Sequence, residues 1–123
     1  MSKTRRIQWL TKPEDHDYTA AASYLSLMYV PLVVAGFVAR LKSARITEFK
    51  AKDIFRASGL PLLGVSNSHV EKDRQKIRGG RKLSPLLLLR DSPRGRVIIA
   101  DGYHRLCAVY SRDEDAVIPC KIV

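Results

Sequence analysis

The sequence predicts a single α+β domain, and three observations support this prediction. Helical segments come first, beginning with a charge-free stretch over residues 18–39. Two short apolar runs, Leu86–Leu89 and Val97–Ala100, follow and are typical of paired strands. Helical patterns flank that pair, and 123 residues suffice for one hydrophobic core. We therefore expect helices followed by a small mixed sheet with flanking helices.

The charge-free stretch is long enough to span a bilayer, but its composition favours two buried helices. Polar residues and a glycine make it only mildly apolar, and Pro31 interrupts a continuous helix because it lacks a backbone N–H. We predict helices over about 19–29 and 31–43, and no membrane span. They form an N-terminal helical extension, residues 1–45, packed on a main domain of residues 46–123.

The pattern changes after the second helix. Apolar residues between Ile46 and Phe55 are interleaved with polar ones, which predicts a short strand or helical turn around 49–56. Ser58–Pro61 has the composition of a turn, and Leu60–Leu63 is expected to be extended.

Residues 67–78 carry a strong helix signal. Asn67 or Ser68 can cap the N-terminus, and Gly79 follows the end. Acidic residues lie early and basic residues late, which complements the helix dipole. Val70 and Ile77 define a narrow apolar seam, so most of this helix is expected to face solvent.

The leucine run that follows lies between Pro85 and Arg90 and predicts a strand buried on both faces. Residues 91–95 have turn composition, so this strand is expected to pair with the next one as a hairpin. A helix from about 104 to 111 and a last strand over 116–123 complete the predicted domain.

A polar motif separates the second strand from that helix, and it consists of Asp101, Gly102, Tyr103, His104 and Arg105. The first turn of a helix offers unpaired N–H groups and a positive dipole end, where phosphate binds well. Gly102 would allow a close approach, and His104 and Arg105 would add donors. Asp101 could hold a metal ion, accept a hydroxyl proton or cap the helix. The alternative is an ordinary turn with solvent-facing side chains.

The motif and its strands resemble the core of the ParB N-terminal domain and sulfiredoxin superfamily, over about Phe49–Val123. The shared pattern is a capped helix, a proline before a buried strand, a second strand and a glycine-led motif that opens a helix. The motif is Gly-Glu-Arg-Arg in ParB proteins and Gly-Cys-His-Arg in sulfiredoxin. Small-molecule kinases of this fold carry Asp-Gly-X-His-Arg, which is closer to the motif here. The earlier segment resembles an extension of uncharacterised bacterial members.

This resemblance implies a nucleotide-binding protein with ATP as the expected triphosphate or diphosphate ligand, with or without Mg²⁺. It leaves a phosphotransferase activity open, in which Asp101 and His104 would be the catalytic residues. Phosphate-binding residues would come from the motif and from one face of the preceding helix, whose alternative role is a solvated charged surface. They are Gly102, Tyr103, His104, Arg105, His69, Lys72 and Lys76.

Two departures limit what the resemblance implies. Tyr103 stands where sulfiredoxin has its nucleophilic cysteine, so cysteine-phosphosulfinate chemistry is not expected. Cys107 lies four residues further on among apolar neighbours, where packing is favoured over reactivity. The further motifs of the ParB clamp are absent from this sequence, so a role in DNA segregation is not expected.

The charge leaves other functions open. The chain has 22 Lys and Arg against 12 Asp and Glu, a net charge of +10, and such an excess attracts polyanions. One alternative is therefore a nucleic-acid-binding or nuclease-like module. Another is a non-catalytic regulatory protein that uses its N-terminal helices as a partner surface, and a homo-oligomer is also left open.

The cysteines and histidines predict neither a disulfide nor a metal site. Cys107 and Cys120 lie in apolar surroundings and fit no metal-ligand spacing, so we expect buried, reduced thiols and a cytoplasmic protein. His16, His69 and His104 are scattered along the chain without ligand spacing. The N-terminus has no signal-peptide pattern.

Overall fold

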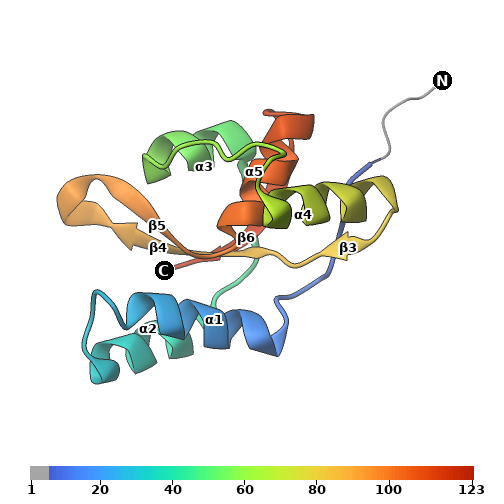
Figure 1. Ribbon diagram of the computed structural model, residues 1–123. Coiled ribbons are helices and arrows are strands. Elements are labelled where there is room, and N and C mark those ends of the chain that lie inside the picture. Colours follow the sequence, from blue (N-terminus) through green and yellow to red (C-terminus); the bar gives the residue numbers. More distant parts are fainter. Residues whose placement is uncertain (1–5) are drawn as a thin grey trace.

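A four-stranded mixed sheet organises the protein, and helices cover both of its faces (Figure 1). The computed structural model describes residues 6–123. The strand order is β2-β6-β4-β5, in which β4 and β6 run parallel and both outer pairs are antiparallel. The strands are β2 (Thr47–Lys50), β4 (Leu86–Asp91), β5 (Arg96–Asp101) and β6 (Val117–Ile122).

The helices divide between the two faces of the sheet (Figure 1). One face is covered by α3 (Ala51–Ser58), α4 (Ser68–Arg78) and α5 (Tyr103–Arg112). The opposite face is covered by α1 (Asp15–Leu25) and α2 (Pro31–Ser43). The described residues also form three short elements: β1 (Gln8–Trp9), which pairs in parallel with β3 (Lys82–Leu83), and the 3₁₀ turn Ser92–Arg94 between β4 and β5.

The leucine run in β4 supplies both hydrophobic cores, which confirms the prediction of a strand buried on both faces. Leu86 and Leu88 belong to the core beneath α3, α4 and α5, whereas Leu87 and Leu89 belong to the core shared with α1 and α2. Successive strand residues point to opposite faces, so one uninterrupted apolar run can serve two layers of helices.

Several predicted elements are confirmed. The structure is of the α+β class, α2 spans 31–43, and β4 and β5 form the expected hairpin. In α4, the side chain of Asn67 accepts hydrogen bonds from the N–H groups of His69 and Val70, at 2.9 and 3.2 Å, and caps the helix. The last helix begins at Tyr103, one residue earlier than expected, because Gly102 already acts as its N-cap.

Two predicted elements are wrong in extent or type. The first helix spans 15–25 and not 19–29, because the Glu14 N–H donates to the Asp17 carboxylate at 2.9 Å and starts the helix early. The region around 49–56, expected to be a short strand or a helical turn, contains both: β2 ends at Lys50, and α3 follows directly with the left-handed Gly59 as its C-cap.

None of the helices in residues 6–123 is both long enough and apolar enough to span a membrane. Residues 1–5 of the predicted N-terminal extension lie outside the described residues. The described part of the extension contributes Tyr18, Leu25 and Leu41 to the core that it shares with β4 and β5.

Candidate functional site

The junction between β5 and α5 requires glycine. Asp101 is the last residue of β5 and Tyr103 the first of α5, so Gly102 alone makes the turn, with φ of 111°. A Cβ atom at this position would lie 2.7 Å from Leu86 Cγ and 3.0 Å from Arg105 Nη2. Both the backbone conformation and the close packing therefore exclude a side chain here.

A cavity of about 220 Å³ lies between this junction and α4. It brings together every site residue that the sequence predicts, although the two segments are far apart in the chain. One further residue, the buried Asp73 of α4, also contributes. The lining residues are His69, Lys72, Asp73, Lys76, Asp101, Gly102, Tyr103, His104 and Arg105.

Two histidines meet in this cavity. The ring centroids of His69 and His104 are 4.9 Å apart, and the planes are inclined by 40°. Partial burial lowers the pKa of His104 below its usual value, and the neighbouring His69 lowers it further, while Asp73 opposes the shift. His104 is therefore neutral at neutral pH and can donate or accept a hydrogen bond.

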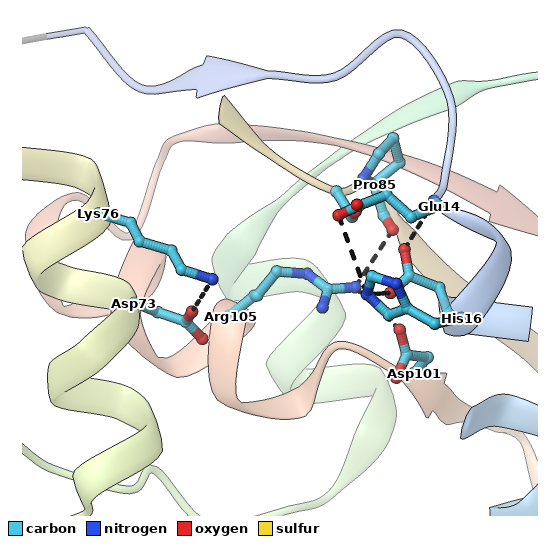
Figure 2. A network of polar contacts seen from close by, with 9 residues as sticks. Glu14, His16, Asp73, Lys76, Pro85, Asp101 and Arg105 are labelled. Atoms are coloured by element: carbon cyan, nitrogen blue, oxygen red, sulfur yellow. Dashed lines mark hydrogen bonds and ion pairs between the residues drawn. The ribbon is translucent and has the colours of Figure 1, made fainter. Parts of the chain in front are cut away.

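Arg105 is held by the junction that it follows. Its Nη2 donates to the Asp101 carboxylate at 3.1 Å and to the carbonyl oxygen of Pro85 at 3.3 Å. Figure 2 shows the guanidinium group pointing toward these two partners. Its buried Nε–H finds no acceptor among residues 6–123. The guanidinium is thus fixed in orientation rather than free to follow a ligand.

Asp101 lies beside a second carboxylate that comes from the opposite face of the sheet. Burial of Asp101 raises its pKa, and Asp17 of α1, itself only 3 % exposed, raises it further. The charge of Arg105 opposes that rise. The sequence alone does not indicate that Asp17 belongs to the site. Its only local signal is an acidic run before a charge-free helix, which indicates a cap and not a contact with residue 101.

The two lysines of α4 differ in whether they form an ion pair. Lys76 Nζ lies 3.8 Å from Asp73 Oδ1, whereas Lys72 is exposed and has no ion-pair partner among the described residues. Apart from its histidines, the cavity carries three cations, Lys72, Lys76 and Arg105, against the carboxylates of Asp73 and Asp101. An excess positive charge therefore remains for an anion.

Tyr103 has a structural contact at this site. Its hydroxyl donates to the carbonyl oxygen of Pro61, which ties the start of α5 to the irregular segment before α4. Its ring also lies near His104, with centroids 5.7 Å apart. Burial and the nearby Cys107 raise the pKa of the Tyr103 phenol, so at neutral pH it acts as a neutral donor.

A second polar cluster lies at the start of α1, where the sequence did not indicate one. His16 Nε2 is 3.9 Å from Glu14 Oε1 and 3.4 Å from Asp17 Oδ1, and Ser84 donates to Glu14 at 3.1 Å. These ligand-type atoms lie within 4.8 Å of one another. Carboxylates at this position also complement the positive end of the α1 dipole, which accounts for the cluster without an ion.

The function of the cavity is inferred from the residues that line it. No protein-family model, no curated protein and no solved structure matches this chain. The cavity combines ammonium and guanidinium groups, imidazoles and the first turn of a helix, all of which donate hydrogen bonds to anionic oxygens.

Proposed function

We propose that the protein binds a nucleotide through its phosphate groups in the cavity between α4 and the N-terminus of α5. The observation that carries this proposal is the convergence on one cavity of Lys72 and Lys76 with the Gly102–Arg105 turn. The resemblance to the ParB and sulfiredoxin superfamily supports the same ligand class, with ATP as the expected nucleotide.

The start of α5 favours an anion in a way that does not depend on side chains. Gly102 has no side chain to cap the first N–H groups of the helix, and no side chain from residues 6–123 makes a cap hydrogen bond there. Those groups and the helix dipole attract a phosphate oxygen. A cavity of about 220 Å³ is smaller than a pocket for a whole small molecule, so the nucleoside would extend beyond it.

The geometry favours binding over phosphoryl transfer. In a transfer step, Asp101 would accept the proton of the acceptor hydroxyl while His104 and Arg105 stabilised the transferred group. Asp101 instead accepts a hydrogen bond from Arg105 and faces Asp17. Its carboxylate is therefore engaged with these two side chains and not with an acceptor hydroxyl. We therefore place Asp101 and Arg105 in the support of the cavity, and Lys72, Lys76 and His104 against the ligand.

A thermal-shift measurement tests the proposal. ATP, ADP, CTP, GTP and inorganic triphosphate are each added with Mg²⁺ at about 100 times the dissociation constant, where binding stabilises a protein by about 2.7 kcal/mol. We expect at least one nucleotide to raise Tm by several degrees and Lys72→Gln plus Lys76→Gln to abolish the rise. Lys82→Gln, an exposed lysine outside the cavity, is the matched control. No shift with any of these ligands would contradict the proposal.

The charge of α4 and the turn after it supports a second candidate, a nucleic-acid backbone as the source of the phosphates. Six basic side chains lie within this short segment against two acidic ones, Glu71 and Asp73. Binding to mixed DNA or RNA that weakens steeply with salt would favour this candidate. Binding of mononucleotides without binding of nucleic acid would exclude it. The basic side chains are Lys72, Arg74, Lys76, Arg78, Arg81 and Lys82.

A further inference from the structure

The outer surface of the α1–α2 hairpin is apolar although it faces away from both cores. Six large hydrophobic side chains within ten residues are exposed there, and Leu27 and Leu32 are 83 % and 85 % exposed. The other exposed large hydrophobics of the described chain are less exposed, at most 58 %, and are Ile46, Leu60, Leu62, Val65 and Val117. We refer to this surface as the hairpin face, and its exposed apolar residues are Tyr24, Leu27, Met28, Val30, Leu32 and Val33.

We propose that the hairpin face binds a second copy of the same chain and forms a symmetric dimer. The first support is the distribution of charge. The protein has a net charge of +10, so two copies repel one another through most of their surfaces. Residues 18–39 contain no charged side chain. The hairpin face itself carries no charge, and Lys42 is the one charged side chain that lines the neighbouring groove, so two copies meet here with less charge repulsion than elsewhere on the described surface.

The second support is shape. A shallow groove runs along the hairpin between α1 and α2, lined mainly by small and aliphatic side chains such as Ala22, Val34, Ala35 and Val38. The turn between α1 and α2 (Figure 1) carries Leu27, and Leu32 is the second residue of α2. Ser26 and Pro31, their neighbours in the chain, line the groove. In a two-fold dimer the same patch serves both copies, so the leucines of one can enter the groove of the other.

The third support is size. A stable interface takes about 800 Å² of surface from each partner. The 13 residues of α2 form a helix about 20 Å long, and two helices side by side are about 20 Å wide with their side chains. A face of these dimensions covers about 400 Å² in projection and more once the relief of its side chains is counted, which places the contact among small interfaces that dissociate readily. Two hairpins packed in this way form a four-helix arrangement between two sheets.

The experiment compares oligomeric states by sedimentation and by light scattering during size exclusion. We expect the wild-type chain, 13.9 kDa, to have twice that mass at about 100 µM and to dissociate on dilution. Leu27→Glu combined with Leu32→Glu should weaken the dimer at least about tenfold. Both positions are exposed, so circular dichroism should show an unchanged fold. Leu62→Glu, a half-exposed leucine outside the hairpin, is the control and should remain dimeric.

The dependence of dimerisation on salt concentration distinguishes an apolar contact from association through charges. Because the contact is apolar and the rest of the surface is repulsive, raising the salt concentration should strengthen it. A wild-type chain that stays monomeric at about 100 µM overturns the proposal. So does a dimer that survives the double substitution. If the monomer binds phosphatidylcholine vesicles through Leu27 and Leu32, the hairpin face belongs to a lipid surface instead of a second copy.

Discussion

The imidazole rings of His69 and His104 contact each other, with centroids 4.9 Å apart, although one belongs to α4 and the other to α5. Two protonated imidazoles at this separation would repel each other, so the pair can accept one proton more easily than two. Because both rings line the cavity with Lys72 and Lys76, the protonation state of the pair sets how much positive charge an anion meets.

Acidification should therefore strengthen the binding of inorganic triphosphate. The pKa of His104 is lowered in the free protein, chiefly by burial, and a bound anion would favour the charged ring. Coupled uptake of one proton increases affinity by up to about tenfold per pH unit. Calorimetric titrations between pH 8 and pH 5 should show this slope in the wild type and a flatter one in His104→Gln.

The unliganded protein should respond to pH in the opposite direction. A histidine whose pKa is lower in the folded than in the unfolded state binds its proton more readily when unfolded. Stability is thus lost as pH falls from the ordinary histidine pKa of 6.5 toward the lowered value. His104→Gln should reduce this loss in thermal unfolding. An equal loss in the variant would show that His104 does not titrate as inferred.

Replacing Gly102 with alanine should destabilise the protein more than the same change at Gly95. Both residues have positive φ, 111° and 63°, but a Cβ at Gly95 would meet nothing within 4 Å. We expect a cost of about 1–2 kcal/mol for Gly95→Ala from backbone strain alone. Contact with Leu86 and Arg105 adds overpacking, so Gly102→Ala should cost about 2–4 kcal/mol in chemical unfolding. Equal costs for the two variants would contradict the close packing seen at Gly102.

Features of the fold that depend on neighbouring residues could be predicted from the sequence, whereas contacts between distant elements could not. The cap at Asn67 and the left-handed turn at Gly102 depend on neighbouring residues, so sequence patterns could indicate them. The leucine run of β4 could also be predicted to form a strand buried on both faces, because few other arrangements accept consecutive apolar residues.

The contacts that complete the site depend on the layers of the fold. Asp17 reaches Asp101 only because α1 packs on the opposite face of the sheet, and no spacing within the sequence contains that information. The contact between the tilted rings of His69 and His104 likewise depends on how α4 lies against α5. Residue types indicated what the cavity could bind, whereas tertiary packing decided which groups are free to bind it.

The Asp17–Asp101 contact can be measured directly. Changing Asp17 to asparagine removes a neighbouring negative charge, so the pKa of Asp101 should fall toward its ordinary value. A carboxyl whose folded pKa is raised contributes stability at acid pH that is lost as pH rises, and this dependence should shrink too. Carbon-13 NMR titration of the Asp101 carboxyl reports the shift. Asp15→Asn, an exposed residue in the same helical turn, is the control that should leave Asp101 unchanged.

The two thiols should be unreactive in the native protein. Cys107 and Cys120 are both free and buried, and burial raises the pKa of the Cys120 thiol to about 12. Burial also raises the pKa of the Cys107 thiol, despite the Leu63 N–H that donates to its sulfur. Since the thiolate is the reactive form, an aromatic disulfide reagent at pH 8 should label neither cysteine until denaturant exposes both.

Cys107 gives this prediction its sharpest outcome, because it lies one turn along α5 from Tyr103. If the segment around Pro61 opened often in solution, Cys107 would react with the reagent well before Cys120 and at a rate independent of global unfolding. Matched rates for the two thiols, each equal to the unfolding rate, would show that the Tyr103 contact holds this segment closed.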